Sequence, residues 1–238
     1  MDLCKKKTAV PTDDPAARYG ETWLWTAIDA PTRLIVAFYG GCRTLAEAKQ
    51  FLALLIARLA TKPLFVSDEL SQYAEGLAEA FHTLVPVPPT GRRGRPRNPV
   101  RVLDADLDYA TVHKTREKGR VVKVERQVVY GTAKRIADRL ASSPSHMINT
   151  AYVERSNLDW RMWDAHLTRK ALTFAKSADW LLAKFAMVVT FYNLLRPHET
   201  LSRGDDRKFY PRTPAMAAGI VDHVWTVKEL VSCYAFCQ

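Results

Sequence analysis

The sequence predicts an α/β protein in which helices flank a central mixed sheet, and three observations carry this prediction. Short apolar runs of strand length alternate with longer segments whose apolar residues recur at helical spacing. Their order from the hairpin onward is strand, strand, helix, strand, helix, which favours a layered α/β domain. The chain has 238 residues, 47% hydrophobic and 25% charged, which is enough for one substantial globular core.

A hairpin and a helix are the first expected elements. Residues 22–29 and 33–39 are apolar and aromatic runs separated by a proline-containing turn, which predicts a β-hairpin with Asp29 at its mouth. Thr44 opens a T-x-x-E capping box ahead of apolar residues at helical spacing, so we expect a helix over 44–60. These two elements rest on signals within the segments themselves.

A strand ending at Asp68 follows, because LFVSDEL is short and almost wholly apolar, which also predicts burial on both faces. The stretch VPVPPTGRRGRPRNPV has no periodicity and predicts an extended, solvated loop. The tail has a second T-x-x-E box at Thr226. The remaining expected elements are a helix over 71–83, strands over 107–114 and 120–131, and helices over 132–141, 152–170, 177–195 and from Thr213 onward.

Positive charge is concentrated in one region. The segment 91–139 holds 14 Lys and Arg against 6 Asp and Glu, while the whole chain has a net charge of +10. A polyphosphate partner favours such a focus, because each neutralised phosphate releases condensed counterions. We therefore expect a polyphosphate partner. The first candidate contacts are the four arginines of RRGRPR, whose Arg-Gly-Arg-Pro core is similar to a minor-groove hook: Arg92, Arg93, Arg95 and Arg97.

Further cations are expected to line the same surface from neighbouring strands, namely Arg101, Lys114, Lys123 and Arg126. The alternative for RRGRPR is a solvated basic loop that touches phosphates without preference. No apolar stretch is long enough and free enough of charge to predict a membrane span. The start, MDLCKKK, has no apolar segment after its charges, and the four cysteines are scattered. We expect free thiols and a cytoplasmic, nucleoid-associated protein.

Two acids are the strongest candidates for chemistry. Asp68 ends a strand, where sheet-based sites gather functional groups, and Glu154 opens a helix much later in the chain. If the two meet in a cleft, a cation between them is required, and Mg²⁺ prefers oxygen ligands of this kind. Two such ions could support phosphodiester chemistry. The alternative is that Asp68 only caps the following helix.

The segment AYVERSNLDWRMWDAHLTRK places a column of polar residues on one helix face. Glu154, Asn157 and Arg161 fall at positions i, i+3 and i+7. Its alternative interpretation is a solvated face with a spaced ion pair. Six tryptophans could stack on unpaired bases, although core packing is the expected role of most. In RPHETL, His198 lies close to Asn193, and we expect a positioning role rather than a catalytic base.

Four stretches in order, LFVSDELSQY, YVERSNLDWRMWDAHLTRKALTFAKS, FYNLLRPHETL and RTPAMAAGIVDHVW, resemble bacterial DDE transposases, most nearly the insertion-sequence-one family. The resemblance runs from ETWLWTAIDAPTRLIVAFYGG to residue 230. It implies a ribonuclease-H-like core in which two aspartates and a glutamate bind two Mg²⁺ or Mn²⁺ ions. It also implies a basic residue about two turns after the glutamate that contacts DNA, a position that Arg161 occupies. Arg169 and Lys170 in the same block are further expected contacts.

The predicted organisation is a catalytic domain over 1–200, with a basic insertion at about 86–140, and a helical tail over 201–238. The third acid stays open: Asp29 is well placed at a strand end, Asp2 is close to the terminus, and the family's Asp-Glu-x-Trp context is not present. It could also precede Met1.

The expected function is DNA cleavage at element ends, followed by strand transfer to target DNA, by a homo-oligomer. An upstream DNA-recognition domain or protein is a further possible partner. The alternatives are a catalytically dead DNA-binding remnant and a structure-specific nuclease of the same fold.

Overall fold

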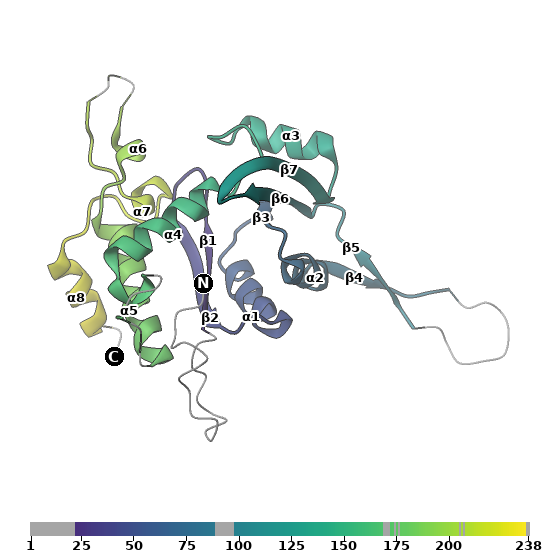
Figure 1. The fold of residues 1–238 in the computed structure, drawn as a ribbon, viewed down its shortest axis with the longest axis horizontal. Helices are drawn as coiled ribbons and strands as arrows, with labels where there is room; N and C mark the ends of the chain where they lie inside the picture. Colours follow the sequence, from purple (N-terminus) through teal and green to yellow (C-terminus); the bar gives the residue numbers. More distant parts are fainter. Residues whose placement is uncertain are drawn as a thin grey trace. The chain divides into compact units, whose positions relative to one another are not determined.

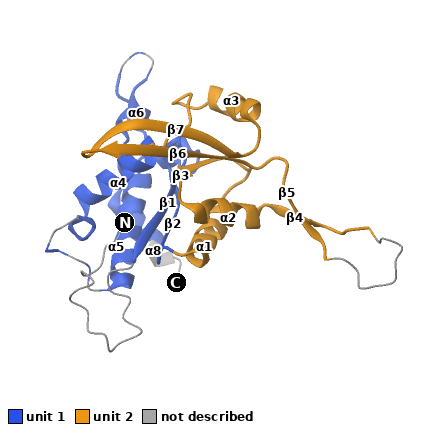
Figure 2. Cartoon of the chain, turned by 45° about the vertical axis from the view of Figure 1, so that its right-hand side comes forward, with its two compact units in different colours: residues 1–43, 151–238 blue, residues 44–150 orange. Residues whose placement is uncertain are grey.

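The computed structural model describes residues 22–88, 98–168, 172–173, 175, 177–204, 206 and 208–236. They belong to two compact units, which Figure 2 colours separately. Unit 1 combines the residues up to 43 with those from 151 onward, and unit 2 comprises residues 44–150. The expected domain boundary at residue 200 stays a prediction.

Unit 2 contains a mixed sheet of three strands between helices, which confirms the α/β class. The strand order is β3-β6-β7, with β3 parallel to β6 and β6 antiparallel to β7. Figure 1 shows α3 on one side of this sheet, with α1 and α2 on the other. The elements of unit 2 are α1 (Leu45–Ile56), β3 (Leu64–Asp68), α2 (Ser71–Ala80), β4 (His82–Val85), β5 (Val100–Leu103), β6 (Asp108–Glu117), β7 (Arg120–Tyr130) and α3 (Ala133–Ala141).

One side of the sheet, which we call the α2 face, is aromatic. The rings of Tyr109 and Tyr130 lie 5.9 Å apart, and the Tyr130 hydroxyl donates to the carbonyl of Ala74 in α2. Phe65 of β3 packs against Phe81, which follows α2, at 5.8 Å between ring centroids. Because these aromatic side chains are at least partly removed from water, their burial favours the packing of α2 on the sheet.

The other side, which we call the α3 face, carries a buried charge. Asp108 is 0% exposed and is paired with two arginines of α3, at 2.6 Å to Arg135 Nη2 and 2.8 Å to Arg139 Nε. Gly131 makes room for it: its φ is +94°, and a Cβ there would lie 2.1 Å from Asp108 Oδ1. Because side chains alternate along a strand and β3 pairs in regular register with β6, the α3 face also carries Val112 and Asp68.

Several expectations for unit 2 require correction. The strand ending at Asp68 is not buried on both faces, because its residues are half-buried and Asp68 is exposed. The helix expected over 71–83 ends at Ala80, and β4 begins two residues later. β4 and β5 pair as an antiparallel ribbon with five exposed apolar side chains, which are Leu84, Val85, Val100, Val102 and Leu103.

Unit 1 consists of a hairpin and a set of helices. The hairpin expected from the two aromatic runs is confirmed, with β1 antiparallel to β2. The elements of unit 1 are β1 (Trp23–Ile28), β2 (Ile35–Gly41), α4 (Ala151–Trp163), the 3-10 helix η2 (Ala165–Leu167), α5 (Ala178–Thr190), the π-helix η3 (Phe191–Leu195), α6 (Glu199–Ser202), α7 (Pro214–Ala217) and α8 (Val227–Phe236).

The hairpin packs on α5 through one close approach. Gly40 of β2 lies so near Leu182 that a Cβ there would come within 2.2 Å of Leu182 Cδ2. The core around this contact is aromatic: the Trp160 ring meets Phe185 at 5.6 Å and Tyr192 at 5.1 Å between centroids. Core packing is thus confirmed for Trp160, which is 1% exposed.

The segment Ala178–Ser202, which comprises α5, η3 and α6, is long and apolar enough to span a membrane by length and composition alone, although no such stretch is expected from the sequence. A core helix of a soluble domain passes the same test. Here Leu181, Phe185 and Val189 form a buried stripe along it, at the spacing of one helix face. We therefore interpret it as the core helix of unit 1. Trp180 lies off this stripe and is 78% exposed, so core packing is wrong for that tryptophan.

The side-chain amide of Asn193 bonds the backbone of the hairpin at the start of β2. Asn193, in the wide turn of η3, accepts a hydrogen bond from Ile35 N at 3.0 Å and donates one to Ile35 O at 3.1 Å. One side chain therefore satisfies both backbone groups of a residue at the start of β2.

The helix expected over 152–170 ends earlier, at Trp163. Asp164 follows with an extended conformation and accepts a hydrogen bond from His166 N, which starts a separate 3-10 turn. The buried Asp164 is also paired with Lys184 of α5 at 2.7 Å. This ion pair within unit 1 fixes the end of α4.

Candidate functional site

Asp68 is the exposed last residue of β3. It lies in a cross-strand row with Val112 of β6 and Arg126 of β7. Within the described part of the chain, no hydrogen bond or ion pair engages its carboxylate. The alternative that Asp68 caps the next helix is wrong, because the N-cap of α2 is Leu70 and no side chain caps that helix.

The neighbouring acid, Glu69, points to the opposite side of the sheet. Its Oε2 lies 2.5 Å from Nδ1 of His113, on β6. Sequence reasoning missed this pair. The available signal was two consecutive acids at a strand end, because neighbouring residues of a strand face opposite sides. Both acids are exposed, but Glu69 is paired, whereas the carboxylate of Asp68 has no partner among the described residues.

A hydrogen-bonded chain holds the end of β3 in place. Ser67 Oγ donates to the carbonyl of Asp68 at 2.6 Å and receives the hydroxyl of Tyr109 at 2.7 Å. Burial raises the pKa of Tyr109, and the nearby charge of Asp68 raises it further. The phenol therefore stays protonated and serves as a donor. These hydrogen bonds hold the backbone that carries Asp68, which suits a carboxylate that must position a ligand.

Asp29 stabilises its own turn. Its Oδ2 accepts hydrogen bonds from Thr32 N at 3.1 Å and Thr32 Oγ1 at 2.5 Å. Its backbone carbonyl accepts from Arg33 N, and Arg33 has a positive φ of 62°. Carboxylates of this kind favour tight turns by bonding backbone groups a few residues on. One oxygen of Asp29 is therefore already engaged by the hairpin.

This turn is linked to the start of α4. The guanidinium of Arg33 lies over the ring of Tyr152, 3.7 Å from its centroid. Tyr152 is in the first turn of α4, where Glu154 is exposed. Unit 1 therefore brings the Asp29 turn beside the helix end that carries Glu154.

The polar column on α4 is confirmed as a helix face, since Glu154, Asn157 and Arg161 all lie within Ala151–Trp163. Glu154 is exposed in the first turn, and Arg161 is half-buried in the last. An acid near the amino end and a base near the carboxyl end both complement the helix dipole. The column thus stabilises α4 whatever else it binds.

Aromatic and cationic side chains surround the carboxyl end of α4. Arg196 lies over the Trp163 ring at 4.1 Å, and Tyr192 meets the His198 ring at 6.2 Å between centroids. Burial raises the pKa of Tyr192 to about 12, and burial lowers the pKa of His198. His198 is thus neutral at pH 7, and its Nδ1 lies 3.0 Å from Thr200 Oγ1. These contacts favour the positioning role expected for His198.

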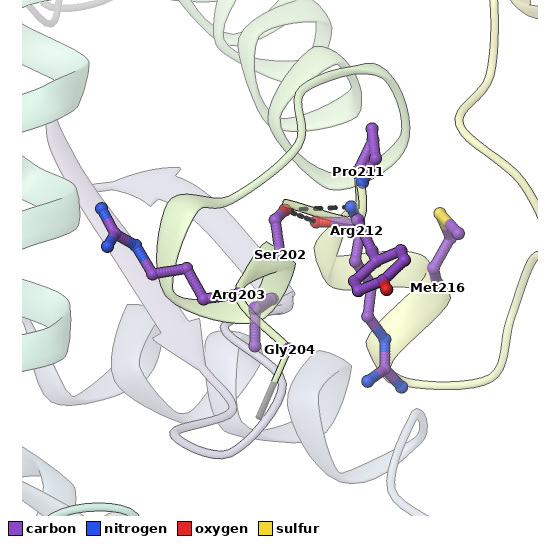
Figure 3. Close-up of a pocket in the computed structure, with 8 residues that line it drawn as sticks. Ser202, Arg203, Gly204, Pro211, Arg212 and Met216 are labelled. Carbon is purple, nitrogen blue, oxygen red and sulfur yellow. Dashed lines mark hydrogen bonds between the residues drawn. The ribbon is translucent and has the colours of Figure 1, made fainter. Parts of the chain in front are cut away.

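A shallow pocket of about 290 Å³ lies elsewhere in unit 1. Figure 3 shows the Ser202 hydroxyl bonded to the backbone of Arg212, from which it accepts at 3.0 Å. Arg203 also lines it, while its guanidinium is paired with Glu199 at 2.5 Å. None of the predicted acids lines this pocket, and we assign it no chemistry.

Other expected contacts cannot be placed. The arginines of RRGRPR, which are Arg92, Arg93, Arg95 and Arg97, lie outside the described residues, as do Arg169, Lys170 and Asp2. In the described ranges, no three His, Cys, Asp or Glu side chains gather into a group that could hold a metal ion.

Searches of protein-family models, curated proteins and solved structures find no match to this chain.

Proposed function

We propose that this chain is a DDE-type transposase with a ribonuclease-H-like catalytic core, similar to the transposases of the insertion-sequence-one family. The observation that carries the proposal is Asp68, an exposed carboxylate on a hydrogen-bonded strand end of a mixed sheet, with no partner among the described residues. Carboxylates left without partners by their fold are candidates for ligand binding, because structural acids are normally capped or paired.

The donors present suit magnesium or manganese. Asp68 and Glu154 supply carboxylate oxygens and are exposed, and hard divalent cations prefer such ligands and keep several waters. Asp29 has one oxygen engaged by Thr32, so it suits this role less well. Two bound ions would supply charge neutralisation for an in-line displacement at phosphorus. Under this proposal Asp68 and Glu154 are both ligands of the ions.

Residues of α4 would position the nucleic acid. Arg161 lies two turns after Glu154 on the same face, so a phosphate next to the reacting group is within its reach. Asn157 lies between them and offers an amide to the same strand. The first step hydrolyses the phosphodiester at the element end, and water takes the place of the leaving group, which departs as a 3′-hydroxyl. In the second step this hydroxyl loses its proton and bonds to the phosphorus of a target phosphodiester, while the target's own 3′ oxygen leaves and takes up a proton.

A DNA-binding remnant without catalysis is the second candidate, and Asp29 favours it. Its carboxylate is engaged within the hairpin turn, so a full set of three acids is not evident among the described residues. A remnant would keep the basic surface while losing tight metal binding.

The Asp68→Asn variant tests the proposal, because it keeps the shape of the side chain and removes the charge. We expect DNA binding to persist and strand transfer in Mg²⁺ to fall by about a thousandfold or more, as when a primary catalytic group is removed. The matched control is Glu69→Gln, the same chemical change one residue later on the opposite side of the sheet. Retained transfer by Asp68→Asn, or equal loss in the control, contradicts the assignment.

Manganese binding separates the transposase from the remnant. If Asp68 and Glu154 share cations, either Asp68→Asn or Glu154→Gln weakens Mn²⁺ binding, and the double variant adds little further loss. Independent, additive effects would show that the two carboxylates do not share a site. One weak ion per chain in the unmodified protein would favour the remnant.

A further inference from the structure

The β6–β7 hairpin extends beyond the end of β3 as a two-stranded ribbon. The register with β3 stops at the pair of Asp68 and Val112, whereas β6 and β7 continue to the pair of Glu117 and Arg120. From residue 113 to residue 126 the ribbon carries six Lys and Arg against two Glu. Its two faces differ in charge.

One face of the ribbon continues the α3 face of the sheet. Lys114 pairs with Val124, Arg116 pairs with Val121, and Val112 pairs with Arg126. Alternation along each strand therefore places three cations, Lys114, Arg116 and Arg126, on this side. The ribbon has no acid here. We call these three residues, with the valines between them, the cationic ribbon face.

The opposite face is compensated. Lys123 Nζ lies 2.7 Å from Glu125 Oε1, and His113 is paired with Glu69. The hydrogen bond from Lys123 lowers the pKa of Glu125. Lys123 was expected to line one surface with Lys114 and Arg126, and this expectation is wrong. Residues three apart in a regular strand, such as Lys123 and Arg126, face opposite sides.

The cationic ribbon face is accessible and partly ordered by its own contacts. Arg116 and Arg126 are exposed, and the valines beside them, Val121 and Val124, are 45% and 39% exposed. Nε of Arg126 donates to the carbonyl of Ile148 at 2.8 Å, which fixes one edge of the guanidinium. Nη2 of Arg126 also donates to Sδ of Met147 at 3.7 Å. Among the described residues Nη1 is thus the nitrogen that can still face a ligand, and a guanidinium suits phosphate geometry.

We propose that the cationic ribbon face binds the phosphate backbone of double-stranded DNA and leads it to Asp68. This inference rests on the proposed function for the choice of DNA as the polyanion. Lys114 and Arg116 are two residues apart, roughly 6.8 Å along a strand. That length equals two nucleotide steps of one DNA strand, at about 3.4 Å of axial rise per step. A two-stranded ribbon also fits the width of the major groove.

The same row fixes where the backbone would run. Arg126 lies two strands away from Asp68 on the same face, a distance of roughly 10 Å between backbones. A phosphate held by Arg126 therefore approaches the carboxylate without reaching it. Since carboxylate and phosphate repel, a cation between them is required for closer approach.

The Lys114→Gln, Arg116→Gln double variant of the full chain tests the inference. Binding to a 30-base-pair duplex is measured by fluorescence anisotropy over a range of KCl, with EDTA present so that no metal-dependent chemistry occurs. We expect affinity to fall by about tenfold to a hundredfold at 0.1 M salt. The slope of log affinity against log salt should become shallower by about two.

The matched control is Arg120→Gln with Lys123→Gln, which removes the same charge from the opposite face. Its slope should stay near that of the unmodified chain. Equal losses in both double variants, an unchanged slope in the first, or equally tight binding to anionic vesicles or single-stranded DNA would overturn the inference. Thermal unfolding verifies that each variant is folded.

The two proposals fail separately. Loss of binding in the Lys114 and Arg116 variant without any strand transfer by the unmodified chain supports the ribbon and refutes the transposase. If the unmodified chain performs strand transfer but the substitutions leave the salt slope unchanged, the transposase is supported and the ribbon inference is refuted.

Discussion

Asp68 and Asp108 lie on the same face of the same sheet, yet their surroundings are opposite. Asp108 is fully buried and held by two arginines, whereas Asp68 is exposed and has no partner among the described residues. The sheet register places Asp108 opposite Leu64, four residues before Asp68 on β3. The difference teaches that position on a strand does not decide an acid's role. What decides it is whether the fold supplies counter-charges.

Removal of Asp108 should have the largest effect on stability. Asp108→Ala leaves Arg135 and Arg139 without their shared partner, and breaking a buried pair in this way costs about 3 to 5 kcal/mol. Urea unfolding monitored by circular dichroism measures the change. Asp68→Ala is the comparison, and its free energy of unfolding should stay within about 0.5 kcal/mol of the unmodified chain. Equal destabilisation would remove the distinction between the two acids.

Gly131 sharpens the comparison, because it creates the space that Asp108 fills. Gly131→Ala introduces a Cβ at a positive φ and within 2.1 Å of the carboxylate, so we expect a loss of about 2 to 3 kcal/mol. Gly119 has a similar φ of +82° but nothing within 4 Å of such a Cβ. Gly119→Ala should therefore lose only about 1 kcal/mol. Unfolding curves that shift equally would show that contact with Asp108 contributes nothing.

Glu229 is an intermediate case and should give the smallest effect. It is exposed, but it bonds Thr226 N at 2.7 Å and His223 Nε2 at 2.9 Å at the start of α8. The hydrogen bond from Thr226 N is the largest cause that lowers the pKa of Glu229, to about 2. Hydrogen bonds to Asp222 and Glu229 raise the pKa of His223 above 6.5.

The two shifts predict opposite pH limits. A depressed carboxyl pKa stabilises the folded state above the unfolded value of 4.5, and this is lost as pH falls toward about 2. A raised histidine pKa stabilises it below 6.5, and this is lost as pH rises through the folded value. Amide exchange at the start of α8 should thus be slowest between 4.5 and 6.5. His223→Gln should abolish the alkaline loss alone; if that loss persists, His223 is not its source.

Elements specified by local signals were predictable from the sequence. The T-x-x-E boxes correctly placed the starts of α1 and α8, because Thr44 accepts from Glu47 N and Thr226 exchanges two bonds with Glu229. These contacts span three residues and need nothing else from the fold. The strand ending at Asp68 was predictable in the same way, from a short apolar run with an acid after it.

Features that depend on distant partners were not predictable. α4 stops at Trp163 because Asp164 pairs with Lys184, twenty residues later in the chain. β4 and β5 are joined by pairing across the proline-rich segment, so HTLV alone gives a weak strand signal. The residues of the candidate site differ in the same way, according to whether a local signal or the folded structure determines their role. Asp68 could be found from its strand, but the engagement of Asp29 by Thr32 and the face on which Lys123 lies follow from turn geometry and register.

The side-chain amide of Asn193 bonds both backbone groups of Ile35, which bears on whether another chain can pair with this strand. A strand residue with an open N–H and C=O invites a neighbouring chain to add a strand there, which is how sheets aggregate edge to edge. Asn193 occupies both groups of Ile35 with one planar side chain. The π-helical turn that carries it therefore leaves neither backbone group of Ile35 open to pairing with another chain.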